Sequence, residues 1–289
     1  MSVARIAEME RRGVVAVEGA DARKFIGDLV TADLDRLDTA GAVFGALLSP
    51  QGKVLFDFFI LADEGRLLFD LPAPLVGEFV KRLGFYKLRA KVTIADLSQE
   101  RSVAVMWGGE HPAVDGPVAR DSRLDALGFR AILPKGSVMA ADHEESSEAD
   151  YDAHRIALGI PEGGIDFAFG DVFPHDVDMD DLHGVAFDKG CFIGQEVVSR
   201  MEHRGTARRR FVIMAGGDLP TPGTELVAAG RPVGIAGSSA GGTGLALVRL
   251  DRARAAMEAG DAITGGGLAV TLSLPPWARF AWPAATTEG

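Results

Sequence analysis

Residues 188 to 211 read DKGCFIGQEVVSRMEHRGTARRRF and contain Cys191, the single cysteine of the 289-residue chain. Glycines at 190 and 194 permit a tight or positive-φ backbone and let a ligand approach the main chain closely. Gly194 directly precedes a predicted helix, QEVVSRMEHR, whose first amide groups favour an anion or a thiolate. Lys189 adds a cation two residues away. The stretch therefore predicts a reactive thiol, with a small buried side chain as the alternative for a lone cysteine.

The predicted helix after Gly194 carries a polar, charged face. Glu196, Arg200 and Arg204 follow one another at four-residue spacing, and Gln195 begins the adjacent stripe. The arginine-rich run continues through residues 208–210. On an otherwise acidic chain this run predicts a local site for carboxylates or phosphates. A solvated row of scattered salt bridges is the alternative.

Metal and triad chemistry find little support in the sequence. There is no CxxC, no HxxxH and no cluster of cysteine and histidine. One chain therefore cannot supply a four-ligand zinc or iron–sulfur site by itself, and we expect no resident metal. No spacing selects a histidine as the base of a Cys–His–Asp triad.

The bulk composition limits the partners. The formal net charge is −11 and the isoelectric point is near 5.0, which argues against broad nucleic-acid coating and general attraction to anionic membranes. We expect neither direct nucleic-acid binding nor a membrane partner. One cysteine allows no internal disulfide, and the N-terminus has charges where a signal peptide needs an apolar core. These features predict a cytoplasmic protein.

The first two thirds of the chain predict a mixed α+β fold. The pattern begins with a strand over 13–19 and a helix that has Asp21 as its N-cap. Further strands are expected at 42–49, 53–61, 66–71 and 89–97, and a helix at 74–86. This order is not a repeated βαβ pattern. The acidic stretch 142–152 predicts the start of a further helix.

The composition changes after Arg210. Short β-like pieces punctuated by glycine follow one another, as in a small barrel or sandwich. We therefore expect a two-part chain, with an α+β region over 1–210 and a β-barrel domain over 211–289.

The motif KGCFIGQE, together with blocks such as LSPQGKVLFDF (48–58), YKLRAKVTI (86–94) and HRIALGIPEGGIDF (154–167), resembles the YgfZ family. These are folate-binding proteins related to the aminomethyltransferase (T-protein) of the glycine cleavage system. The resemblance extends over most of the chain. It implies a GcvT-like ring of two intertwined, ferredoxin-like α+β subdomains followed by a C-terminal β-barrel. It also implies a tetrahydrofolate cofactor and a role in assembling or repairing iron–sulfur clusters, including those of tRNA-modifying enzymes.

The resemblance also assigns residues. Where T-proteins have an acid and an arginine, this chain has Cys191 and Gln195, whereas Lys189 and Glu196 are retained. Asp57 corresponds to the T-protein acid that positions substrate and pterin. The residues implied for the chemistry are Cys191, Lys189 and Asp57. The residues implied for folate are Asp57, Arg155, Lys189, Gln195, Glu196, Arg200 and Arg204.

Three functions stay open at this point. The first is a folate-binding accessory factor that uses the Cys191 thiol with iron–sulfur client or assembly proteins. The second is a folate-dependent aminomethyl or one-carbon transferase that uses Asp57. The third is a non-catalytic scaffold that docks a client protein. Asp57 favours the transferase, whereas Cys191 and Gln195 favour the accessory factor.

Overall fold

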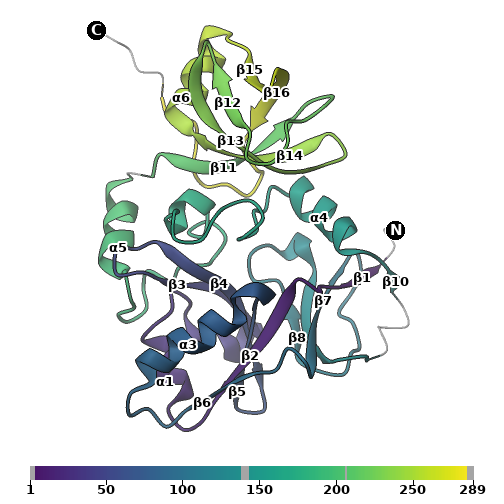
Figure 1. Ribbon diagram of the computed structural model, residues 1–289, viewed down its shortest axis with the longest axis vertical. Helices are drawn as coiled ribbons and strands as arrows, with labels where there is room; N and C mark the ends of the chain where they lie inside the picture. The colour runs from purple at the N-terminus through teal and green to yellow at the C-terminus, as the bar shows by residue number, and fades with distance from the viewer. Residues whose placement is uncertain (1–3, 138–142, 206, 285–289) are drawn as a thin grey trace. The chain divides into compact units, whose positions relative to one another are not determined.

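The computed structural model describes residues 4–137, 143–205 and 207–284 (Figure 1). The chain forms two compact units, and each consists of two segments. The first unit comprises Met1–Tyr151 and Leu182–Val197, and the second comprises Asp152–Asp181 and Val198–Gly289. Asp142, the first residue of the acidic stretch, lies outside the described residues.

The first unit contains a five-stranded sheet of order β3-β4-β5-β2-β6. Its strands are β2 Arg12–Glu18, β3 Ala42–Leu48, β4 Val54–Asp63, β5 Arg66–Pro72 and β6 Thr93–Asp96. Successive side chains of a strand point to opposite faces of the sheet, and one face of this sheet packs against a helix. On this face the rings of Phe56, Phe58 and Phe69 lie 5.2, 5.4 and 5.2 Å from the ring of Phe79 on helix α3 (Val76–Lys87).

A second five-stranded sheet of the first unit has the order β10-β1-β7-β9-β8. Its strands are β1 Arg5–Glu8, β7 Arg101–Trp107, β8 Val118–Arg120, β9 Phe129–Pro134 and β10 Glu144–Glu145. The short helices of this unit are α1 Ala22–Gly27, α2 Leu37–Ala40 and the 3-10 turns Leu34–Arg36, Ala73–Leu75 and Asp125–Leu127.

Buried charges connect the two sheets of the first unit. Asp70 of β5 accepts hydrogen bonds from Arg12 Nε at 2.5 Å and from Arg130 Nη1 of β9 at 2.6 Å. Arg123 forms a two-pronged pair with Asp121, at 3.0 and 2.8 Å. Because all five side chains are nearly inaccessible to water, pairing of the two carboxylates with the three guanidiniums offsets much of the free-energy cost of burying their charges.

The second unit contains a closed six-stranded barrel of order β11-β14-β13-β12-β15-β16. Its strands are β11 Arg209–Ala215, β12 Glu225–Ala228, β13 Arg231–Ala240, β14 Thr243–Arg249, β15 Ile263–Gly265 and β16 Leu268–Ser273. Antiparallel pairing of β11 with β16 closes the barrel and leaves no free strand edge. The helices are α4 Glu148–Ala157 and α5 Gln195–Arg204, which both cross a boundary between units, α6 Leu250–Ala259, and a 3-10 turn at Pro174–Val177.

Most predicted elements are confirmed, including the hairpin of β3 and β4, helix α3, the helix after Gly194 and the β-rich C-terminal part. Asp21 occupies the N-cap position of helix α1 as predicted, but its carboxylate accepts the Lys91 amide at 2.7 Å and makes no capping hydrogen bond. Within the described residues, no helix combines the length and apolarity needed to cross a membrane.

Candidate functional site

Cys191 lies in the loop that leads into helix α5, and its side chain is exposed. The next residue, Phe192, is buried, and Ile193 packs against the core of the first sheet. The buried-cysteine alternative is therefore wrong. The thiol stands at the surface while the residues that follow it are fixed in the first unit.

Lys189 anchors the cysteine loop on its N-terminal side. Its ammonium donates three hydrogen bonds, to the carbonyl oxygens of Gly27 at 2.8 Å, Val30 at 2.8 Å and Ala32 at 2.7 Å. It also lies 5.6 Å from the centre of the Phe192 ring. Burial lowers the pKa of Lys189, and the nearby carboxylates of Asp33, Asp28 and Asp35 oppose that shift. Lys189 is thus a structural clamp on residues 27–32, which corrects its expected role in catalysis or folate binding.

Thr31 joins the same segment to the chain before the cysteine. Its hydroxyl donates to the Gly184 carbonyl at 2.6 Å and accepts from the Ala46 amide at 2.8 Å. The Thr31 carbonyl accepts from the Ala186 amide at 2.9 Å. These bonds are buried, so they fix the path of residues 184–189 against the first sheet.

Gly194 anchors the loop on its C-terminal side. Its φ is 79°, and a Cβ atom at this position would lie 2.6 Å from the Ser49 carbonyl oxygen and 3.1 Å from Gly52. Only glycine permits this approach to the β3–β4 hairpin. Gly190 differs, because a Cβ there would meet no atom within 4 Å. The motif therefore holds Cys191 between two anchored points.

The other motif residues divide into structural and exposed groups. The Gln195 side-chain oxygen accepts a hydrogen bond from the Phe192 amide at 3.4 Å, so this residue supports the loop. Glu196, Arg200 and Arg204 are exposed on helix α5. Of the residues expected to bind folate, these three lie at the surface of α5.

The arginine run does not form one anion site. Arg209 donates to Asp176 at 2.6 Å, and the buried Arg210 donates to both oxygens of Asp180 at 2.6 and 2.7 Å. Arg208 remains exposed. The sequence could not reveal this division, because the acids lie about thirty residues earlier in the chain.

Arg155 has no accessible surface, and its hydrogen bonds lie in the interior of the second unit. Its guanidinium donates to Asp166 at 2.7 Å, Asp152 at 2.6 Å, the Ile160 carbonyl at 3.0 Å and Ser238 at 3.2 Å. Burial lowers the pKa of Arg155, but the surrounding carboxylates outweigh it and raise the pKa overall. With its donors committed, Arg155 cannot receive a folate carboxylate, which corrects its expected role.

Asp57 is buried on β4, opposite Ala46 of β3. It lies two residues from Phe59, on the same face of the strand. The Arg130 guanidinium stacks on the Phe59 ring at 4.1 Å from its centre. Asp57 therefore lies on the face of the first sheet that also carries the buried charges.

The first unit contains a cavity of about 1010 Å³ that none of the predicted residues lines. Its walls include Phe44, Phe129 and the Asp121–Arg123 pair. The Arg120 guanidinium stacks on Phe129 at 4.7 Å from the ring centre. Sequence reasoning missed this cavity, because its lining comes from residues 33–44, 111, 118–129 and 183–186, which no motif connects.

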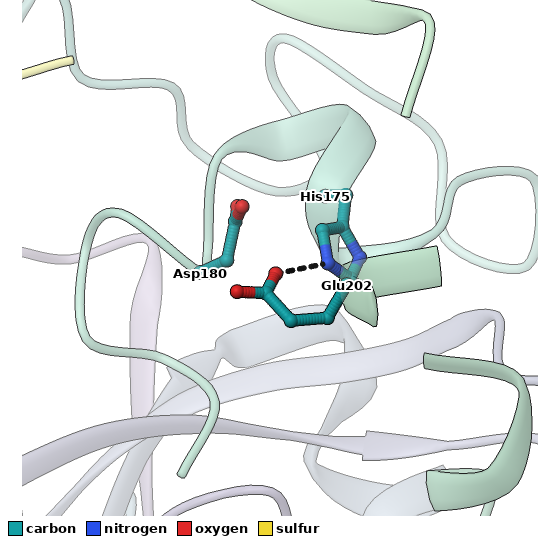
Figure 2. Close-up of side chains that lie close together, drawn as sticks. All are labelled: His175, Asp180 and Glu202. Carbon is teal, nitrogen blue, oxygen red and sulfur yellow. Dashed lines mark hydrogen bonds and ion pairs between the residues drawn. The ribbon is translucent and has the colours of Figure 1, made fainter. Parts of the chain in front are cut away.

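Figure 2 shows a group of three side chains in the second unit with metal-ligand character: His175, Asp180 and Glu202. Their ligand atoms lie within 4.8 Å of one another, and His175 Nε2 is 3.0 Å from the Glu202 carboxylate. The Arg210 guanidinium already occupies both oxygens of Asp180. We assign no metal to this group, because the positively charged Arg210 guanidinium already binds the Asp180 carboxylate.

Comparison with known proteins finds a matching domain family, a solved structure with the same fold and similar sequences. Residues 208–280 match the family model of the CAF17 C-terminal beta-barrel domain. The CAF17-like barrel coincides with strands β11–β16. The crystal structure of the glycine cleavage system aminomethyltransferase T from Bartonella henselae has a TM-score of 0.73 and 16% identity, covering 96% of this chain and 87% of that one. The α+β aminomethyltransferase-like fold with a C-terminal barrel is confirmed.

Similar sequences are iron–sulfur cluster assembly factors. The mitochondrial IBA57 homolog of Mycosarcoma maydis is 31% identical over 226 residues, which cover 72% of this chain but 56% of that protein. Human mitochondrial IBA57 is 28% identical over 305 residues, which cover 95% of this chain and 84% of the human protein. The mouse protein is also 28% identical, over 309 residues.

These relatives correct two expectations. The sequence likeness is to IBA57 proteins, a different branch from the YgfZ proteins named by the motif resemblance. The cytoplasmic location is also wrong on this comparison, since the relatives are named as mitochondrial proteins.

Proposed function

We propose that the chain acts in iron–sulfur cluster assembly or repair by presenting the Cys191 thiol to a partner protein. The observation that carries the proposal is the exposure of Cys191 on a loop anchored at Lys189 and Gly194. The likeness to IBA57 assembly factors supports the same conclusion. A thiol held in a fixed position loses little conformational freedom when it engages a partner.

The chemistry that one exposed thiol offers is limited. After losing its proton, the sulfur can bind one iron of a cluster that the partner carries, replacing another ligand of that iron. The cluster is then cargo, and the partner supplies the other ligands because this chain has no second cysteine. Thiol–disulfide exchange with a partner is the alternative use of the same atom. Enzymes that modify tRNA are included among the proposed clients.

Tetrahydrofolate binding is a separate part of the proposal, and the expected residues fit it only in part. Lys189 and Arg155 do not fit, because carbonyls and carboxylates occupy their donors. Arg200 and Arg204 are exposed and carry the charge that the glutamate tail requires. Asp57 is the remaining candidate for the pterin. We assign no chemical step to folate.

Complementation tests the role of the thiol. In cells that lack the native gene, an iron–sulfur-dependent enzyme is assayed after expression of wild type, Cys191→Ser or Gly190→Ala. We expect rescue by wild type and Gly190→Ala but not by Cys191→Ser, since serine preserves the size of the side chain and removes the sulfur. Equal rescue by Cys191→Ser would overturn the proposal.

A second candidate function, aminomethyl or one-carbon transfer, is favoured by the buried Asp57 on β4. The same assay separates the two functions when Asp57→Asn is added. Loss of rescue with Asp57→Asn and retention with Cys191→Ser would favour the transferase. Titration of the purified chain with tetrahydrofolate, wild type against Arg204→Ala, tests the ligand itself.

A further inference from the structure

The C-terminal end of helix α3 exposes two large apolar side chains. Phe85 is 67% exposed and Leu88 is 88% exposed, and these are the highest values for large apolar residues in the described part of the chain. On the opposite side of the helix, Phe79 and Leu83 are fully buried in the core. The two exposed side chains therefore project from a helix that is firmly anchored.

The backbone at this point is strained. Leu88, directly after the last residue of α3, has φ 43° and ψ −105°, a conformation that costs a leucine free energy. The turn directs the chain toward β6 through Arg89 and Lys91. Neither hydrophobic burial nor a favourable backbone conformation stabilises a leucine at this position.

Cations surround the exposed pair. We call the basic tip the set Lys81, Arg82, Phe85, Lys87, Leu88, Arg89 and Lys91. No acidic residue occurs between Glu78 and Asp96, although the whole chain has a net charge of −11.

Two carboxylates contact residues of the basic tip. Glu78 accepts from Arg82 at 3.4 Å, and Asp21 accepts from the Lys91 amide at 2.7 Å. Within the described ranges, the side chains of Lys81, Lys87 and Arg89 form no ion pair. The positive charge of the tip is therefore available to a partner.

We propose that the basic tip docks the protein on an anionic lipid bilayer. Phe and Leu beside several lysines and arginines are the combination found in segments that lie in the membrane interface, where rings and alkyl groups enter the acyl boundary and cations meet headgroups. Three of the five cations are lysines, a residue depleted from protein–protein interfaces. Phe85 projects from the last turn of α3 and Leu88 from the residue that follows the helix, and both are exposed, which suits insertion into a fluid surface.

The net charge does not oppose this local contact. Charges farther than about 8–10 Å from the headgroups are largely screened at physiological salt, so the tip acts on the bilayer more strongly than the remaining surface does. The acidic net charge opposes general attraction to anionic membranes, whereas the basic tip concentrates positive charge at one place on the surface.

Vesicle co-sedimentation of the full chain tests the proposal. We use phosphatidylcholine vesicles with and without about a third of phosphatidylglycerol, at low and high salt. We expect about tenfold stronger partitioning onto the anionic vesicles at low salt, lost at high salt. Two double variants should each lower partitioning onto the anionic vesicles about tenfold. One carries Phe85→Ser with Leu88→Ser, and the other carries Lys87→Glu with Arg89→Glu.

The matched control lies on the barrel, where Ile235 is 50% exposed and Arg231 is also exposed. Ile235→Ser with Arg231→Glu should leave partitioning unchanged. Circular dichroism melts establish that every variant is folded. Equal partitioning of wild type on both vesicles, failure of wild type to bind either, or an equal loss in the barrel control would each overturn the proposal. Failure to bind any vesicle would indicate a protein partner for the tip.

Discussion

At the scale of single residues, the two glycines that flank Cys191 have different tasks. Gly194 occupies a positive φ and touches the β3–β4 hairpin, whereas Gly190 faces open space. Sequence reasoning treated them alike, because both stand beside the same cysteine. Only the packing of the hairpin distinguishes them.

We predict that Gly194→Ala lowers the free energy of unfolding by about 2–4 kcal/mol, because the new Cβ meets the Ser49 carbonyl and the φ is unfavourable. Gly190→Ala should change it by less than about 0.5 kcal/mol. Urea unfolding of both variants measures the difference. Equal effects would show that the loop is not anchored at Gly194.

Asp178 gives a prediction of pH dependence. Complete burial raises its pKa well above the usual value of 3.8, Asp180 and Asp181 add to this, and Arg210 opposes it. The folded state therefore keeps a proton that the unfolded state loses. The stability from this group is complete below the unfolded pKa and decreases as pH rises toward the folded pKa.

We expect Asp178→Asn to stabilise the protein at about pH 8 and to have little effect at about pH 4, since asparagine resembles the protonated acid. Asparagine also tolerates the φ of 60° at this position. Urea unfolding at both pH values checks the sign. A stability difference that narrows as pH rises would contradict the assignment.

At the scale of elements, short runs of apolar residues predicted strands β2 to β5 well, because these strands are buried along most of their length. The second sheet escaped prediction. Strand β9 places Arg130 among apolar neighbours, and its ion-pair partner Asp70 stands sixty residues earlier. Pairing over such a separation leaves no local pattern. The same reason explains why Lys189 was assigned to a ligand: the carbonyl oxygens that receive its hydrogen bonds lie 157 to 162 residues earlier in the chain.

The buried charges that join the sheets predict a large effect at Asp70. Asp70→Ala should lower the free energy of unfolding by about 3–5 kcal/mol, because Arg12 and Arg130 lose a shared carboxylate away from water. Asp38→Ala, which breaks an exposed pair with Arg23, should cost at most about 1 kcal/mol. Chemical denaturation compares the two, and similar losses would mean that the Asp70 network is hydrated.

At the scale of the whole molecule, the chain does not complete one unit before it starts the other. Residues 152–181 belong with the barrel, although residues 182–197, which carry the cysteine motif, belong with the first unit. Composition alone predicted a division at residue 210, and this division stays a prediction. The sequence shows where the strands of the barrel begin, but it does not show that residues 152–181 pack in the same unit.

This arrangement predicts the behaviour of the isolated barrel. A fragment of residues 208–289 should be poorly folded, because Arg210 loses Asp180 and Ser238 loses Asp166, both of which lie in residues 152–181. Thermal melting by circular dichroism should give a broad, early transition for the fragment and a cooperative one for the full chain. A sharp transition for the fragment at the full-chain temperature would contradict this.

The Lys189 ammonium has three protons, and each can form a hydrogen bond with one of three carbonyl oxygens. A planar guanidinium cannot place three donors on the same three points, so arginine is no substitute for lysine here. The nitrogen also has no lone pair to offer while it is bound in this way. Amine-directed reagents should therefore label the surface lysines of the native protein but not Lys189. Labelling of Lys189 at a later time would show that the loop around Cys191 has opened.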